Sequence, residues 1–168
     1  MTAPTTHTTA TVLAPDGGER LRFLDASTMR LKLAGAANSE VAVYEYVSEP
    51  GAYGPPQHIH HGHDETFYVV AGTYQFTIGT DVHALPAGGF LHVPRGTPHT
   101  FRNCGSGTGR IVGTFNPPRF ADYFRELAVI IEATGGAPDR ATWAELYARY
   151  DTTFYEPPDV ASGDRFDR

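Results

Sequence analysis

One stretch organises this sequence: His58-Ile59-His60-His61-Gly62-His63-Asp64-Glu65, followed further along by Pro94-Arg95-Gly96-Thr97-Pro98-His99. Four of the eight histidines of the chain fall within the first segment. Random use of a scarce residue would not crowd it in this way. The segment therefore indicates a site built from imidazole side chains, and the rest of the sequence is interpreted as its support.

The spacing of the histidines predicts that their side chains converge. His58 and His60 are two residues apart, which places both imidazoles on one face of an extended strand. Glu65 has the opposite parity, but a turn expected at Gly62 resets the register, so that its carboxylate can also point inward. His99 leads into an apolar strand and can supply a fourth ligand. Three imidazoles and one carboxylate suit a divalent first-row metal.

Length and composition bound the class of protein. A chain of 168 residues fits one domain with a substantial core. Its 18 glycines and 13 prolines, set between short apolar runs, predict the many turns of an all-β domain. The net charge of −6 and the lack of a basic stripe argue against nucleic acid as a partner.

The compartment expected from the sequence is the cytoplasm. The single cysteine, Cys104, cannot form an internal disulfide, which fits a reducing environment. Residues 1–6 have neither the basic nor the apolar segment of a signal peptide. No apolar run is long enough to span a bilayer, so no membrane partner is expected.

Apolar periodicity divides the chain into four parts. Residues 1–18 are rich in Thr, Ala and Gly and are expected to form a flexible N-terminal arm. Residues 19–116 contain roughly nine or ten short alternating runs bounded by turn residues, which is typical of a β-barrel or sandwich. Residues 117–156 change to helical spacing, and residues 157–168 are expected to be a polar tail.

The helical part predicts two short C-terminal α-helices. The first is expected to start at Pro118 and to stop at Gly135-Gly136, with its apolar residues at helical spacing. The second shows the spacing of a capping box at Thr142 and Glu145. The apolar stripe of the first helix is expected to pack against the barrel and could cover one of its mouths.

The two histidine-bearing segments resemble the two sequence motifs of the cupin superfamily. The first motif, G-x5-H-x-H-x3/4-E-x6-G, is matched from its first histidine onward by His58, His60, Glu65 and Gly72, whereas its leading glycine falls on Ala52. The second motif, G-x5-P-x-G-x2-H-x3-N, is matched throughout, by Gly88, Pro94, Gly96, His99 and Asn103. The resemblance covers roughly residues 40–116.

This resemblance implies a double-stranded β-helix, a jelly-roll barrel of antiparallel strands. It implies that His58, His60, Glu65 and His99 bind one divalent transition metal per chain: Fe, Mn, Ni, Co, Cu or Zn. The layout of a single barrel with two added helices looks like the single-domain cupins of the bacterial quercetin 2,3-dioxygenase-like group. A homodimer is expected from the same resemblance.

Three kinds of function are open at this point. A metal-dependent dioxygenase would act on a small phenolic or enolic compound, with dioxygen as second substrate and Glu65 as both ligand and catalytic proton acceptor. A non-redox cyclase or isomerase would use the metal to polarise a carbonyl of a polyketide- or sugar-like intermediate. A small-molecule-binding protein would use the cavity without chemistry. The dioxygenase is the preferred hypothesis.

The remaining histidines are interpreted as peripheral. His61 and His63 flank Gly62 and are expected to be exposed turn residues, with a place at the cavity mouth as the alternative for either. His83 and His92 lie in predicted strands and are expected to be outward or interfacial. The aromatic residues of the strands are expected to be mostly core, because core and cavity share the inner face of a small barrel.

Overall fold

The computed structural model describes residues 10–24, 27–35 and 39–157. Residues 1–9 of the predicted arm and residues 158–168 of the predicted tail lie outside the described residues. The part of the arm from Pro15 to Gly17 is held to the first sheet, because the Lys32 ammonium group donates hydrogen bonds to the carbonyls of both residues at 2.8 and 3.0 Å.

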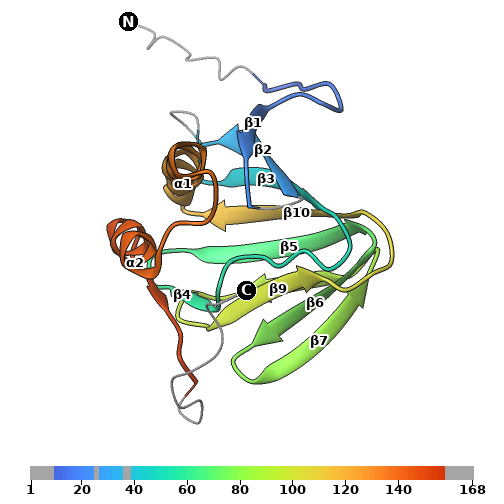
Figure 1. Ribbon diagram of the computed structural model, residues 1–168. Helices are drawn as coiled ribbons and strands as arrows, with labels where there is room; N and C mark the ends of the chain where they lie inside the picture. Colours follow the sequence, from blue (N-terminus) through green and yellow to red (C-terminus); the bar gives the residue numbers. More distant parts are fainter. Residues whose placement is uncertain (1–9, 25–26, 36–38, 158–168) are drawn as a thin grey trace, which may run out of the picture.

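The described chain is mostly β-structure with two helices near its C-terminal end (Figure 1). The elements are, in order, β1 (Glu19–Arg22), β2 (Ser27–Ala34), β3 (Ala42–Ser48), β4 (His58–His60), β5 (Asp64–Ala71), β6 (Thr73–Ile78), β7 (Asp81–Pro86), β8 (Phe90–Val93), β9 (His99–Asn103), β10 (Gly109–Asn116), α1 (Phe120–Thr134), α2 (Arg140–Arg149) and β11 (Thr152–Phe154).

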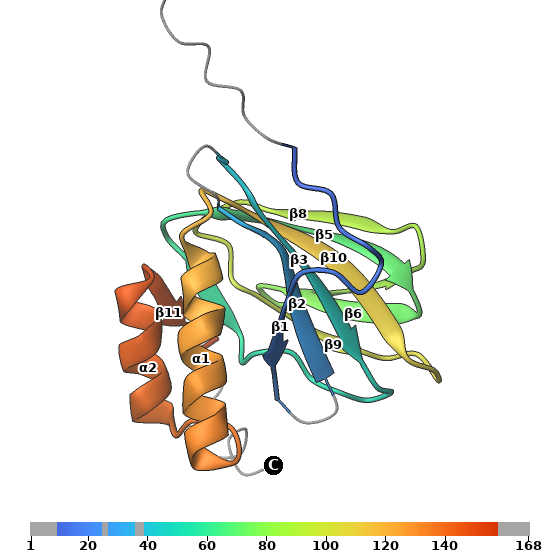
Figure 2. The same ribbon diagram turned by 90° about the horizontal axis from the view of Figure 1, so that it is seen from above.

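The strands form two antiparallel sheets that face each other as a jelly-roll barrel (Figures 1 and 2). One sheet has the order β1-β2-β3-β10-β5-β8 and the other β11-β4-β9-β6-β7. Alternate residues of β5, β9 and β10 are buried between the sheets, as the period of two requires. The predicted all-β fold with two C-terminal helices is confirmed.

The core between the sheets is rich in aromatic side chains. Seven strand aromatics are buried: Tyr44, Tyr46, Phe67, Tyr74, Phe76, Phe101 and Phe115. Tyr68 is 49% exposed on the outer face of β5, and Phe90 is 61% exposed. Phe90 begins β8, at the edge of its sheet, where its side chain points away from the core.

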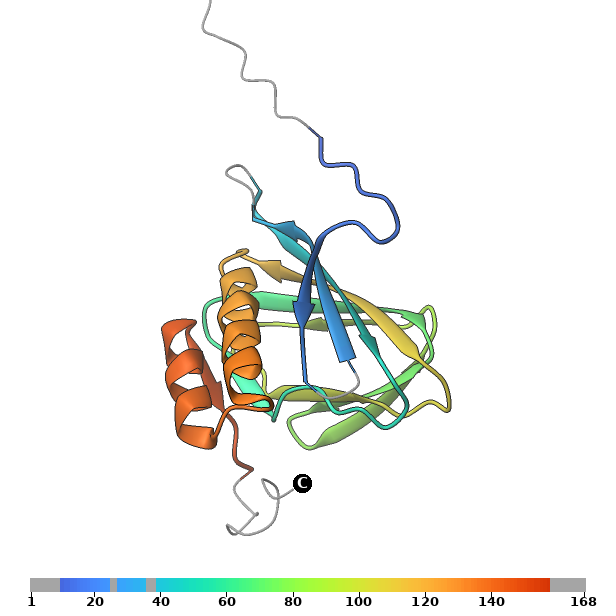
Figure 3. The same ribbon diagram turned by 45° about the horizontal axis from the view of Figure 1, so that its top comes forward.

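The two helices lie side by side at one end of the barrel (Figure 3). Helix α1 ends at Gly135, which adopts the left-handed conformation (φ 75°), as the glycine pair predicted. Helix α2 is capped by Asp139, whose carboxylate accepts from the Thr142 amide at 2.8 Å, so the predicted capping role of Thr142 is wrong. Neither described helix has the length and apolarity to cross a membrane.

The strand after α2 was not expected from the sequence. β11 pairs antiparallel with β4, placing Thr152 opposite His60 and Phe154 opposite His58. It is three residues long and only two residues separate it from α2, so it offers too little alternation to be seen in a sequence. Its effect is to join the end of the described chain to the strand that carries the first histidine pair.

Candidate metal centre

The strands bring His58, His60, Glu65 and His99 together inside the barrel. His58 and His60 stand on the inner face of β4, and His58 lies opposite His99 of the adjacent β9. Glu65 comes from β5 in the other sheet and points across the barrel interior. The turn between β4 and β5 carries the chain from one sheet to the other, which turns Glu65 inward despite its odd parity.

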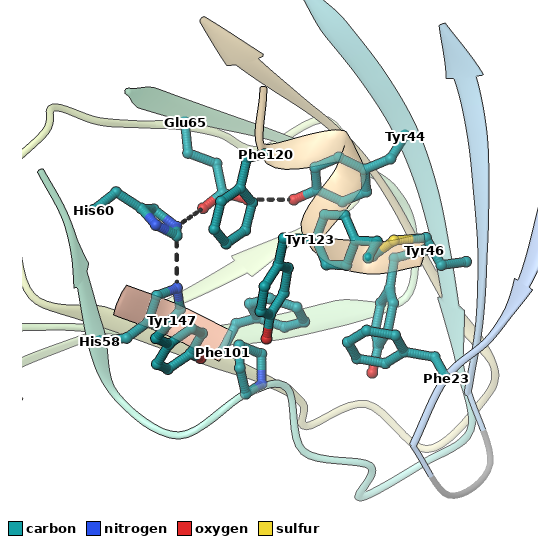
Figure 4. A pocket seen from close by; sticks show the side chains of 13 residues that line it. Phe23, Tyr44, Tyr46, His58, His60, Glu65, Phe101, Phe120, Tyr123 and Tyr147 are labelled. Atoms are coloured by element: carbon teal, nitrogen blue, oxygen red, sulfur yellow. Dashed lines mark hydrogen bonds and ion pairs between the residues drawn. The ribbon is translucent and has the colours of Figure 1, made fainter. Parts of the chain in front are cut away.

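The four side chains are buried and closely grouped, and Figure 4 shows three of them, His58, His60 and Glu65. One ligand atom from each of the four residues lies within 4.8 Å of all the others. The Nε2 atoms of His58 and His60 are 3.1 Å apart. Glu65 Oε2 is 3.0 Å from His99 Nε2 and 3.3 Å from His60 Nε2.

The outer nitrogen of each imidazole is fixed by the backbone or by a neighbouring hydroxyl. His58 Nδ1 lies 2.9 Å from the Pro56 carbonyl, and His99 Nδ1 lies 3.0 Å from the Thr97 carbonyl. A carbonyl can only accept, so each Nδ1 carries the hydrogen and each Nε2 of a neutral ring presents a lone pair to the centre. This arrangement is typical of metal-binding histidines.

His60 is oriented by a residue 92 positions further along the chain. Thr152 Oγ1 donates to the Tyr150 carbonyl at 3.1 Å, so it accepts from His60 Nδ1 at 3.0 Å. Sequence reasoning missed Thr152, because only the pairing of β11 with β4 brings it beside His60. A single threonine after a helix carries no signal of this role.

The donor set fits a divalent cation. Three imidazole lone pairs and a carboxylate oxygen crowd a buried space, and without a positive charge between them these electron-rich atoms would repel one another. Burial lowers the pKa of His58 well below its usual value, and the neighbouring His99 and His60 lower it further. Burial also lowers the pKa of His60. Neutral imidazoles are the form that binds a metal.

Tyr44 holds the second oxygen of Glu65. Its hydroxyl donates to Glu65 Oε1 at 2.7 Å, in the interior (Figure 4). Burial, together with the adjacent Glu65 carboxylate, raises the pKa of Tyr44 well above its usual value, so the phenol stays a donor. Burial alone would raise the pKa of Glu65, but hydrogen bonds and positive charge from His60 and His99 outweigh it and lower that pKa below its usual range. When the imidazoles present lone pairs instead, a bound cation would act on Glu65 in the same direction. Glu65 is therefore ionised, with Oε2 directed at the histidines.

Replacing Tyr44 by phenylalanine is expected to weaken metal binding. The change removes the donor to Oε1 and leaves that oxygen free to rotate toward the centre, and a lost outer hydrogen bond to a ligand typically costs about 10- to 100-fold in metal affinity. A titration of metal-free protein with Zn²⁺ or Mn²⁺ would measure this. Tyr74→Phe is the matched control, since it also loses a buried hydroxyl contact, to Ser48, away from the cluster. Equal affinities in the two variants would contradict the role of Tyr44.

The two histidines beside Gly62 behave differently. His61 is exposed, as predicted, and its Nε2 lies 2.9 Å from Thr153 Oγ1. His63 is buried, so its prediction as an exposed turn residue is wrong. The centroid of its ring lies 4.0 Å from that of the His60 ring and 4.5 Å from that of the Phe120 ring. Phe120 is there because α1 begins beside this turn and covers it. Burial lowers the pKa of His63 to about 3, so it is a neutral packing residue beside the cluster.

His83, His92 and Asp64 lie outside the site. The two histidines are exposed on their strands, in agreement with the sequence prediction. Asp64 precedes Glu65 but faces the other way, where the Arg95 guanidinium group donates to it at 2.9 Å. The alternation of β5 therefore separates a surface carboxylate from the buried one.

A small cavity extends from the cluster toward Phe23 (Figure 4). Its volume is about 20 Å³. Barrel residues line one side, and Phe120, Tyr123 and Phe124 of α1 with Tyr147 of α2 line the other. The helices therefore cover the mouth nearest the cluster, as the sequence suggested for α1, and make its wall aromatic.

Comparison with known proteins gives a family and one curated relative. The family model described as "Cupin domain" matches residues 44–115. Quercetin 2,3-dioxygenase from Bacillus subtilis (strain 168) is 34% identical over 116 residues, which are 67% of this chain and 33% of that protein. The chain thus spans about a third of the length of this relative.

Solved structures share the fold. A predicted oxalate decarboxylase from Thermotoga maritima superposes with a TM-score of 0.58 at 18% identity, covering 63% of this chain and 98% of that one. A sugar phosphate isomerase of the cupin superfamily from Silicibacter pomeroyi superposes with a TM-score of 0.55 at 22% identity, covering 62% and 74%. At these identities the likeness concerns the fold alone.

Proposed function

The chain belongs to the cupin superfamily, and on that premise we propose that it is a metal-dependent dioxygenase acting on a small phenolic or enolic compound. In this proposal His58, His60, Glu65 and His99 hold one divalent transition metal. The observation that carries it is the convergence of their four ligand atoms within 4.8 Å, with the outer nitrogens of the histidines tied back.

The type of reaction is supported by the curated relative. Quercetin 2,3-dioxygenase shares 34% identity over a segment that includes two thirds of this chain. The aromatic lining of the cavity suits a flat, conjugated substrate. A cytoplasmic location is proposed because Cys104 is exposed and forms no disulfide, which fits a reducing compartment. A homodimer stays a prediction.

In this proposal the residues of the chain have two tasks: they hold the metal and they accept a proton from the substrate. When bound, the metal would acidify a substrate hydroxyl group and give access to electron transfer with dioxygen. Tyr44 keeps one carboxylate oxygen of Glu65 occupied, which leaves the other to face the histidines and the substrate. An ionised carboxylate in this position can accept the proton of a substrate hydroxyl group. Phe120 and Phe124 make the space above the cluster apolar and leave little room in it for water.

Oxygen consumption tests the proposal. Metal-loaded protein is expected to consume dioxygen above background with at least one flavonol, catechol or β-diketone, and Glu65→Gln is expected to reduce the rate by at least about 100-fold through loss of the proton acceptor. The metal content of the variant is measured alongside, to separate loss of the base from loss of the ion. Product formation that proceeds equally well without oxygen would contradict the dioxygenase and indicate a non-redox isomerase or cyclase. Recovery of unchanged ligand would indicate a binding protein.

A further inference from the structure

The helices cover the candidate metal centre with a stack of aromatic rings. The ring of Tyr147 lies on that of His58, with centroids 5.5 Å apart and an angle of 22°. Tyr123 follows at 5.5 Å and 24°, and Phe120 at 4.4 Å and 16°. The Tyr147 ring also contacts Trp143 and Phe154, with centroids 6.0 and 5.0 Å away, so it is held on several sides while it lines the cavity.

The Tyr147 hydroxyl group has no hydrogen-bond partner within 3.5 Å, and its polar neighbours are the side chains of Tyr123 and Trp143. Among the described residues, two buried side-chain polar atoms lack one: His63 Nε2 and Tyr147 Oη. Tyr147 is 1% exposed and lines the cavity, whereas His63 does not line it. A buried polar group without a partner is costly, so one that faces a cavity requires an explanation from what the cavity holds.

The neighbouring donors and acceptors do not satisfy every hydroxyl group at the cavity. Trp143 Nε1 donates to Tyr123 Oη at 2.9 Å, which leaves Tyr123 with one hydrogen to give. If a small movement pairs the hydroxyl groups of Tyr147 and Tyr123, one phenol donates to the other, and the hydrogen of the second phenol still lacks an acceptor. One free donor therefore remains at the cavity that both phenols line, and it belongs to Tyr147 whenever Tyr123 donates.

We propose that Tyr147 is a specificity-determining residue, whose hydroxyl group donates a hydrogen bond to an oxygen of an aromatic substrate at a point away from its metal-chelating group. The inference rests on the proposed function for the class of ligand. It names a flat molecule with two separate polar regions: a chelating pair for the metal and an acceptor oxygen, such as a ring hydroxyl or carbonyl, for Tyr147.

The cavity is small, so a ligand that reaches Tyr147 must displace side chains of the two helices. A volume of about 20 Å³ holds one water molecule, so a ring-sized ligand enters only if side chains of α1 and α2 shift outward. Those helices contribute Tyr147, Tyr123 and Phe120, and the exposed ion pair of Arg125 with Glu19 joins α1 to β1. The group that selects the substrate therefore lies on the part that must move to admit it.

Two flavonols with the same single chelating pair, the 3-hydroxyl and the 4-ketone, provide the test. 3,4′-Dihydroxyflavone carries one ring hydroxyl that 3-hydroxyflavone lacks, and it gains no second chelating pair. Protein loaded with Zn²⁺, which has no redox chemistry, is titrated with each under nitrogen by calorimetry, so that binding is measured without turnover. The parent is expected to bind 3,4′-dihydroxyflavone about tenfold more tightly, and Tyr147→Phe is expected to remove this preference. This binding measurement does not depend on turnover, so it can be interpreted even if the oxygen-uptake assay fails.

Tyr150→Phe is the matched control. It deletes the same group from a tyrosine just after α2, whose hydroxyl donates to Glu126 at 2.6 Å on the outer side, and it is expected to keep the preference. Tyr147→Phe should melt at the parent temperature or higher, because the deleted hydroxyl has no partner. A preference that survives in Tyr147→Phe overturns the proposal, as does lack of binding of either flavonol to the parent. A lower melting temperature with unchanged preference would show a structural role and overturn it too.

Discussion

His60→Ala is expected to lose the metal. His60 lies at the middle of the cluster, with its Nε2 3.1 Å from His58 Nε2 and 3.3 Å from Glu65 Oε2. Removing it takes away one donor and leaves the ionised Glu65 with less compensation in a buried site. Since even outer partners of a ligand are worth about 10- to 100-fold in affinity, loss of a ligand should exceed about 100-fold. Metal content by mass spectrometry on tag-free protein would show about one ion per chain in the parent and little in the variant.

Thermal unfolding measures the loss of metal binding in His60→Ala in a second way. A ligand that binds the folded state stabilises it by about 2.7 kcal/mol at 100 times its dissociation constant. Parent protein should therefore gain stability when metal is added, and His60→Ala should not. His61→Ala is the control, because His61 is adjacent in sequence but is exposed and hydrogen-bonded to Thr153. A His60→Ala variant that kept one ion per chain would show that the metal lies elsewhere.

Gly113→Ala is expected to damage both the fold and the centre. Gly113 of β10 lies directly opposite Tyr44 of β3, and a Cβ atom placed on it would be 2.2 Å from Tyr44 Cζ and 2.3 Å from Oη. The ring cannot easily move away, because it stacks on Phe115 at 4.9 Å and 17°. Overpacking of this kind costs about 1–3 kcal/mol, and each kcal/mol lowers the melting temperature by about 2–4 °C in a chain of this size. Displacing the Tyr44 hydroxyl should also weaken metal binding.

A double-mutant cycle separates the clash from other effects. Tyr44→Ala removes the atoms that the new methyl group would meet, so the two substitutions together should cost less than the sum of their separate effects. Gly107→Ala is the control, since Gly107 is exposed and no atom lies within 4 Å of its added Cβ. It is expected to change stability by less than about 0.5 kcal/mol. Additive costs in the cycle would contradict the proposed contact.

The pattern of the sequence was sufficient for the barrel and for the four candidate ligands. Strand alternation, the glycine stop of α1 and the spacing of His58 and His60 are local properties, and each corresponds to what the structure shows. Glu65 and His99 come from separate strands, but the resemblance to cupin motifs already grouped them with the first pair. The number of strands was underestimated because β11 has three residues.

The surroundings of the four residues depended on the tertiary structure. The polar and glycine neighbours of His63 predict an exposed turn, and only the position of α1 buries this residue. Asp139 rather than Thr142 caps α2. The side chain of the residue just before the helix is the one that reaches the unpaired amides of the first turn, and here it accepts from the Thr142 amide. Tyr44 could equally have been a core residue, since the inner face of a barrel serves both core and cavity.

The sequence by itself determined which residue types could bind a metal and on which strands they lie. Only the tertiary structure decided how they are oriented and what covers them. The reason is distance along the chain: Tyr44 reaches Glu65 across 21 residues and Thr152 reaches His60 across 92. Periodicity records which face of its own strand or helix a residue occupies, whereas these contacts depend on how separate strands and helices pack against one another.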